Sequence, residues 1–217
     1  MNHKKVYRLY RETGLLKRKR MRKKVSRRRR NAPLKQAERA NQRWAMDFTS
    51  DSCENGSKLR TLNIVDIFTR ECPSIEVGSS LPTVKVIMVL DMLSEERGLP
   101  ESITVDNGPE YTSKAIEKWA AGKSIDFEYI TPGRPMENGF IESFNGKFRE
   151  ECLDQNSFRS VSEAKEIIEL WRQDYNKKRP HSSLNYMTPE EFIKTLQEQS
   201  DNRKELCESP KTASRGC

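Results

Sequence analysis

Three carboxylates of this 217-residue chain have the residue type and the setting for metal-assisted chemistry. Asp47 lies inside a predicted strand, Asp106 follows the end of another predicted strand just before Asn-Gly, and Glu142 lies near the start of a predicted amphipathic helix. Strand ends beside a helix are where an α/β sheet opens its functional crevice. The sequence therefore predicts that the three side chains converge on one all-oxygen site.

Such a convergence needs neutralising charge. Three carboxylates about 5 Å apart repel one another by roughly 3 kcal/mol per pair, so protons or cations must bind among them. Oxygen ligands favour Mg²⁺, with Mn²⁺ as a substitute, and two such ions can assist displacement at a phosphodiester. A single strand aspartate is more often a turn, cap or surface group, and we assign Asp66 to that structural class.

The excess positive charge of the chain is confined to its N-terminus. The whole sequence carries 40 Lys and Arg against 32 Asp and Glu, a net charge of +8. Residues 1–30 contain 15 of the basic residues and only Glu12, a net of +14, which leaves 25 basic and 31 acidic residues elsewhere, a net of −6. A basic arm of this kind suits DNA or another polyanion, although a solvated tail is the alternative.

The elements that must position the carboxylates read as an α/β domain. In 43–51, period-two alternation places Trp44, Met46 and Phe48 on one face and Asp47 on the other. This strand and the next two form an antiparallel meander, and the following strands alternate with helices, which implies a parallel half of the same sheet. The remaining predicted elements are strands 59–70, 71–80, 101–108 and 125–132 and helices 82–98, 113–123, 136–153, 160–176 and 188–199.

The helix predicted over 136–153 presents one packing stripe and one polar stripe. Ile141, Phe144, Phe148 and Cys152 form the first, whereas Glu142 belongs to the second. Three regions follow from these patterns. They are a basic arm with linker at 1–40, a core at 41–195, and a polar tail at 196–217 that we expect to be disordered.

Four segments of the chain resemble the transposases of bacterial insertion sequences whose catalytic core is similar to retroviral integrase. These segments are WAMDFT, ITVDNGPEY, YITPGRPMENGFIESFNGKFREECL and YNKKRPHSSLNYMTPEEF, and the resemblance covers about residues 41–195. The family writes its acidic triad as D, D, 35, E, and 35 residues separate Asp106 from Glu142 here.

The resemblance implies a ribonuclease-H-like fold in which Asp47, Asp106 and Glu142 are the catalytic, metal-binding triad. It also implies DNA cleavage at element ends and joining of the freed 3′-hydroxyl to target DNA, with Mg²⁺, by a homo-oligomer on DNA. Family members usually carry a fuller helix-turn-helix region upstream, whereas this sequence begins in what resembles its last part. A catalytically silent DNA-binding or regulatory fragment is therefore the alternative function.

Basic and amide side chains around the triad are candidates for phosphate contacts. A solvated helix face is the alternative for each one, and for His181 a structural role is as well supported as DNA contact. The candidate DNA-binding residues are Arg134, Asn138, Asn145, Lys147, Arg149, Lys177, Lys178 and Arg179.

Other function classes are disfavoured. A ribonuclease H acting on RNA–DNA hybrids usually needs a further helix carboxylate, for which Asp91, Glu95 and Glu96 are the candidates. The five cysteines are scattered without a CxxC pair, which argues against a disulfide framework and a zinc site. Neither a secretory signal nor an apolar run of about 20 residues occurs, so we expect a cytoplasmic protein of the bacterial cytosol or nucleoid without a membrane partner.

Overall fold

The computed structural model describes residues 5, 8, 12, 13, 37–130 and 139–208, with the backbone alone at 203–208. The chain divides into two compact units, residues 1–31 and 32–217. In the first unit, Lys5, Arg8 and Glu12 are helical, and Arg8 Nε lies 3.8 Å from Glu12 Oε1 one turn later. The second unit contains the sheet and the three carboxylates, and it is described on its own below.

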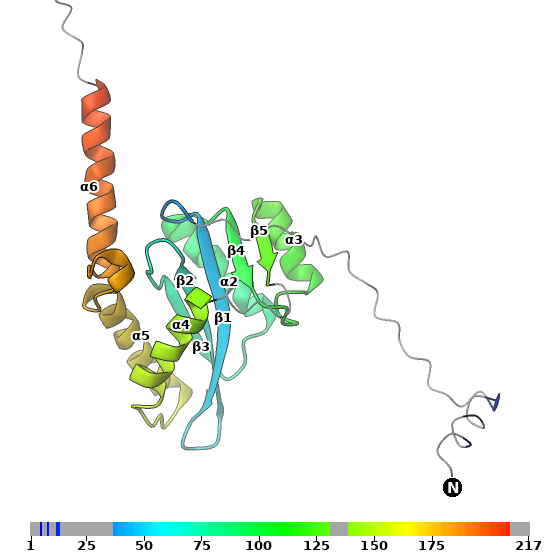
Figure 1. Cartoon of the computed structure of the whole chain (residues 1–217). Coiled ribbons are helices and arrows are strands. Elements are labelled where there is room, and N and C mark those ends of the chain that lie inside the picture. Colours follow the sequence, from blue (N-terminus) through cyan, green and yellow to red (C-terminus); the bar gives the residue numbers. More distant parts are fainter. Residues whose placement is uncertain (1–4, 6–7, 9–11, 14–36, 131–138, 209–217) are drawn as a thin grey trace, which may run out of the picture. The chain divides into compact units, whose positions relative to one another are not determined.

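One five-stranded mixed sheet forms the centre of the second unit, in the order β3-β2-β1-β4-β5 (Figure 1). β1 pairs antiparallel with β2, and β2 with β3, whereas β1 pairs parallel with β4, and β4 with β5. This arrangement confirms the predicted meander with a parallel half. The strands are β1 Arg43–Ser52, β2 Lys58–Asp66, β3 Ser74–Gly78, β4 Ser102–Val105 and β5 Asp126–Tyr129.

Helices cover both faces of the sheet and bury two separate apolar cores. On one face, Trp44 and Met46 of β1 pack with residues of helices α2 (Thr83–Arg97) and α3 (Lys114–Lys123). On the other face, Ala45 packs with residues of helices α4 (Gly139–Phe148) and α5 (Val161–Lys177). Figure 1 shows α4 and α5 on one side of the sheet and α2 on the other. The predicted alternation along β1 is therefore confirmed.

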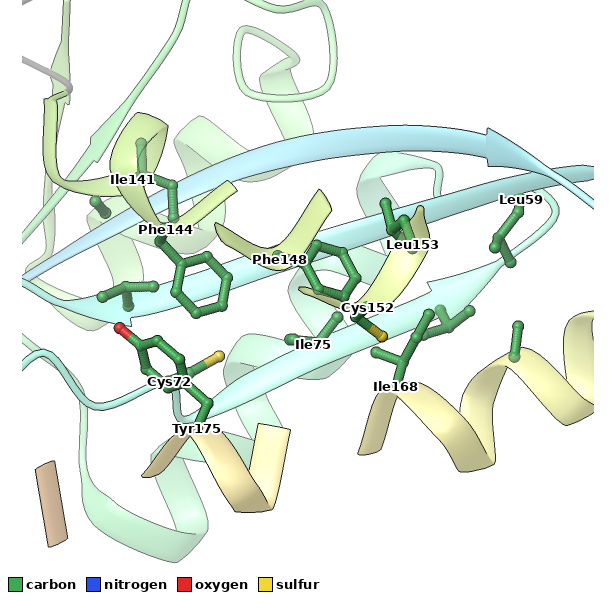
Figure 2. Packing of buried hydrophobic residues seen from close by; sticks show 14 of the residues in the cluster. Leu59, Cys72, Ile75, Ile141, Phe144, Phe148, Cys152, Leu153, Ile168 and Tyr175 are labelled. Carbon is green, nitrogen blue, oxygen red and sulfur yellow. The ribbon is translucent and has the colours of Figure 1, made fainter. Parts of the chain in front are cut away.

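The helix predicted over 136–153 changes type along its length. It is α-helical from Gly139 to Phe148 and continues as a π-helical turn over Arg149–Leu153, while 136–138 lie outside the described residues. Figure 2 shows Ile141, Phe144 and Phe148 of this segment packed over the strands, with Tyr175 and Ile168 of α5 beneath them.

The polar tail predicted from residue 196 begins later than expected, because helix α6 runs from Pro189 to Glu208. A capping box starts this helix, with the Glu191 amide 3.2 Å from Thr188 Oγ1 and the Thr188 amide 2.8 Å from Glu191 Oε2. Its Gln, Glu and Lys residues are good helix formers, so a polar composition does not separate a solvated helix from a disordered segment. Residues 209–217 lie outside the described part.

Two further expectations concern cysteines and membranes. Cys53, Cys72 and Cys152 are buried free thiols, and burial raises the pKa of Cys152 to about 12. Among the helices of the described ranges, none combines the length and the apolar character that a membrane crossing requires.

Candidate active site

Asp47 lies near the middle of β1, on the face covered by α4 and α5. Its neighbours on that face, Ala45 and Thr49, are small, so a helix can approach the strand closely there. The Phe48 amide donates to Asp47 Oδ1 at 2.8 Å. Burial, and then the charges of Asp106 and Glu142, raise the Asp47 pKa to about 6. The three predicted carboxylates therefore act on one another electrostatically.

Asp106 directly follows β4, the parallel neighbour of β1. Trp44 pairs with Ile103 and Ala45 with Thr104, and the same register continued by two residues brings Asp106 opposite Asp47. Neighbouring strands lie about 4.8 Å apart. Asp106 is exposed, in keeping with its position at the open end of the strand.

The loop after β4 is shaped around the Asp106 carboxylate. The Gly108 amide donates to Asp106 Oδ1 at 2.8 Å, and Asn107 Nδ2 donates to the carbonyl of Ile130 at 2.9 Å. A Cβ at position 108 would stand 2.8 Å from Asp106 Oδ1 and 3.2 Å from Glu110 Oε2. Glycine is therefore required there, because the backbone approaches the carboxylate too closely for any side chain.

An aromatic and ionic network, which sequence reasoning missed, ties this loop to β1 and β2. Tyr111 stacks on Phe48 with ring centroids 5.3 Å apart, Arg60 lies 4.1 Å over the other aromatic ring of the pair, that of Phe48, and Arg60 pairs with Glu110 at 2.8 Å. Burial, and then Asp47 and Asp106, raise the pKa of Tyr111. This network fixes the position of the loop that carries Asp106.

Glu142 is exposed on the first turn of α4, which an aromatic cluster holds against the sheet. The Phe144 ring meets Tyr175 of α5 edge-on at 5.0 Å, and Phe148 lies 5.0 Å from Trp171. Since the aromatic positions repeat with helical spacing, they bury one flank of α4 and leave the other to Glu142. The predicted packing stripe is confirmed.

A chain of amides links α4 to both β1 and β2. Asn145 Nδ2 donates to Asp47 Oδ2 at 2.8 Å, and Asn63 Nδ2 donates to Asn145 Oδ1 at 2.7 Å. Asn63 also reaches Thr49 Oγ1 at 3.1 Å. The sequence predicted Asn145 as a phosphate contact, but in the structure both ends of its amide are bonded within the protein. Asn63 was missed, and its polar side chain in the apolar run TLNIVD was the available signal.

The chemistry of the donor set fits a hard divalent cation. All three groups are carboxylates, two of them are exposed, and none forms an ion pair with a Lys or Arg of 37–130 or 139–202. Within these ranges no three acidic, histidine or cysteine side chains are close enough to hold a metal ion as they stand. Mutual repulsion favours this separation, so metal binding would require the carboxylates to move closer.

The other predicted DNA-binding residues fall into three sets. Arg134 and Asn138 lie outside the described residues. Lys147 and Arg149 follow Glu142 on α4 and the π-helical turn, and Arg149 donates to the Ser50 carbonyl at 3.1 Å.

The third set lies at the end of α5. Lys177 and Lys178 are exposed, and Lys178 pairs with Asp174 at 2.7 Å. Arg179 is partly buried and pairs with Glu151 of the π-helical turn. This set therefore joins α5 to the segment that follows Glu142.

Two alternative carboxylate assignments are resolved by the structure. Asp66 accepts from the backbone amides of Asn41, Phe68 and Thr69, at 2.7, 2.8 and 3.1 Å, which confirms its structural role. Asp91 accepts from Trp119 Nε1 at 2.9 Å between α2 and α3, on the sheet face opposite α4. Asp91 therefore does not join the three carboxylates as a ribonuclease H site would require.

Comparison with protein families places the whole described core in one class. A model described as "Integrase core domain" matches residues 37–135, and a second model with the same description matches residues 123–189.

Relatives with high identity come from bacterial insertion elements. An uncharacterized 31.7 kDa protein of insertion element IS407 from Burkholderia multivorans is 43% identical over 88% of this chain and 69% of its own length. An uncharacterized 39.2 kDa protein of IS476 from Xanthomonas euvesicatoria is 41% identical over 93% of this chain and 58% of its own. The transposase InsD of insertion element IS2 from Escherichia coli is 28% identical, over 94% and 70%.

A solved structure with the same fold is the HTLV-2 integrase catalytic core domain in complex with magnesium. It matches with a TM-score of 0.54 at 18% identity, over 70% of this chain and 95% of its own. At this identity the likeness supports the ribonuclease-H-like fold and no more.

Proposed function

The chain belongs to the transposases of bacterial insertion elements that carry an integrase core domain, and from that premise we propose that it is a DNA transposase. In this proposal it cleaves DNA at the ends of its element and joins the freed 3′-hydroxyl to target DNA. The observation that carries the proposal is the placement of two carboxylates on adjacent parallel strands, beside a helix that presents a third.

Asp47, Asp106 and Glu142 are the residues that would hold the metal. Mg²⁺ is the proposed ion, Mn²⁺ its substitute, and two ions would take part during the reaction. When bound, they supply Lewis acidity at the attacking and leaving oxygens of the phosphodiester. The chemistry of the three carboxylates and the magnesium complex of the HTLV-2 integrase core support this choice.

The protein's own groups orient the carboxylates and leave one side open to DNA. Asn145 and the Phe48 amide each hold one oxygen of Asp47, and the Gly108 amide holds one oxygen of Asp106. Such bonds reduce the motion that must be frozen before reaction, which is how positioning contributes to rate. Asp106 and Glu142 are exposed, so a scissile phosphate can enter from solvent.

DNA is the proposed partner, bound by the basic arm and by side chains around the site. Lys147, Arg149, Lys177 and Lys178 are the contacts that we propose among the described residues, and Arg134 and Asn138 stay predictions. Assembly as a homo-oligomer on DNA is part of the proposal, because two element ends must meet before joining. The relatives' coverage of 58–70% leaves room for further segments in a full-length transposase.

A strand-transfer assay on pre-nicked element ends tests the function. The element ends are read from the inverted repeats that flank the gene, and the product is followed with and without Mg²⁺. Joined product that requires both Mg²⁺ and Glu142 supports the transposase. DNA binding without cleavage would instead identify a regulatory fragment, and cleavage of an RNA–DNA hybrid alone would identify a ribonuclease H.

A further inference from the structure

The helix that carries Glu142 presents a second, positively charged site on its other flank. Phe140 and Lys147 lie seven residues apart and share one side of α4, whereas Glu142 lies about 140° around the helix from Lys147. The Arg70 guanidinium stacks on the Phe140 ring at 4.0 Å. Arg70 therefore joins Lys147 beside this flank, although it comes from the turn that follows β2.

His181 lies among these cations. It follows α5, and its ring meets Tyr175 edge-on at 5.1 Å. Burial, and then the charges of Lys147, Arg179 and Arg70, lower the His181 pKa to about 4. The imidazole is therefore neutral near pH 7, with one ring nitrogen able to donate a hydrogen bond.

His181 has a buried nitrogen without a partner in the described part of the chain. The residue is 7% exposed, and its Nε2 atom is buried with no hydrogen bond. A buried polar atom that stays unpaired costs about 1–3 kcal/mol, so native proteins rarely keep one without a reason. Surrounded by cations, this nitrogen is suited to donate to an anion.

The cationic groups are not fully neutralised by nearby acids. Arg179 pairs with Glu151, but Lys147 forms no ion pair within 37–130 or 139–202. Arg70 donates from Nε to Ser183 Oγ at 3.3 Å, which joins its turn to the segment after His181. It does so from a left-handed backbone with φ 62°, a strained conformation of the kind found at binding sites.

We propose that Arg70, Lys147 and His181 bind one phosphate group of the DNA backbone, apart from the phosphate that enters the carboxylate site. Arg70 and Lys147 supply charge, and His181 supplies a neutral donor. The inference rests on the proposed function. It adds a second point of attachment, so that DNA crossing α4 is held on both flanks of the helix and cannot rotate freely about the reacting phosphate.

The salt dependence of DNA binding tests the site in the full chain, with EDTA present so that catalysis plays no part. Binding of a short duplex of mixed sequence is measured for wild type and for Arg70→Gln, Lys147→Gln and their double variant. Each single variant should weaken binding about tenfold and lower the salt slope by about one. The double variant should lower the slope by no more than the singles, because both side chains bind the same phosphate.

Two further variants sharpen the result. His181→Gln should weaken binding without changing the slope, because a neutral donor releases no counterion. Arg159→Gln is the matched control, since Arg159 is exposed and its loss removes the same charge elsewhere on the surface. Melting curves establish that each variant is folded. Binding by Arg70→Gln equal to that of Arg159→Gln would overturn the inference, whereas failure of wild type to bind any duplex would overturn the proposed function itself.

Inorganic phosphate separates a DNA site from a site for free phosphate. The sequence contains only two histidines, His3 and His181, so the imidazole resonances are assigned by comparing wild type with His3→Gln. Phosphate added at constant ionic strength should shift the His181 resonances, and Arg70→Gln should abolish this shift. A phosphate response without any loss of DNA binding in Arg70→Gln would refute the assignment to the DNA backbone.

Discussion

Replacing Asp47 with Asn should stabilise the metal-free protein at pH 8 while abolishing strand transfer. Burial, followed by Asp106 and Glu142, raises the Asp47 pKa from 3.8 to about 6. The native carboxyl therefore holds its proton to higher pH than the unfolded one. Its contribution to stability is fully present below the unfolded pKa near 4 and is lost as the pH rises through about 6.

The size of the effect follows from that pKa difference. About two pKa units correspond to about 3 kcal/mol at pH 8, and solvent screening at a half-buried group lowers the figure to about 1–2 kcal/mol. Asn keeps the volume of the side chain without the charge. The amide chain can also adapt, because Asn145 and Asn63 can rotate end for end, and Asn63 Oδ1, which has no partner among the described residues, would then accept from Asn145.

Urea unfolding in EDTA at pH 8, pH 5 and pH 4 measures the effect. The gain of Asp47→Asn over wild type should be largest at pH 8, smaller at pH 5 and close to zero at pH 4. Asp51→Asn on the same strand is the matched control, because the next residue's amide also donates to its Oδ1, at 2.8 Å. Added Mg²⁺ should stabilise wild type and not Asp47→Asn. A variant less stable than wild type at pH 8, or a gain that does not change with pH, would refute the reasoning.

Three other outcomes are expected. Asp106→Asn and Glu142→Gln should each abolish strand transfer with an unchanged melting curve, because both side chains are exposed; near wild-type turnover would exclude that residue from the triad. Phe144→Ala should lower the free energy of unfolding by about 3–5 kcal/mol in a denaturant titration, since the ring is 2% exposed. Removal of residues 1–30, with their net charge of +14, should weaken DNA binding and make its salt slope shallower, and an unchanged slope would mean that the arm does not contact phosphate.

Much of the fold and the setting of the three carboxylates could be predicted from local patterns. Alternation along 43–51 placed Asp47 opposite Trp44 and Met46, and the helical spacing of Ile141, Phe144 and Phe148 left Glu142 on an exposed flank. These patterns are local because period two and period 3.6 each repeat within one element. The parallel half of the sheet followed from strands that alternate with helices.

The contacts that orient the site could not be predicted in this way. Asn145 lies 98 residues from Asp47 and 82 from Asn63 along the chain, and a single sequence carries no signal for such a pair. The same holds for Arg60 and Glu110, which meet across the sheet from β2 to the loop after β4. Long-range polar pairs depend on the final packing of elements, whereas the elements themselves depend on their own periodicity.

The amide chain explains how one site can be both ordered and ready for a cation. A carboxylate offers about four lone-pair positions, and the Phe48 amide and Asn145 together use two of those on Asp47. The remaining positions can face a metal without breaking either bond, so Asn145 orients Asp47 rather than blocking it. Because Asn145 lies one turn after Glu142 on α4, the same bond fixes how far Glu142 stands from Asp47. The spacing of the carboxylates is therefore set by the docking of α4, and the repulsion among them is offset by the aromatic packing of Phe144 and Phe148 beneath the helix.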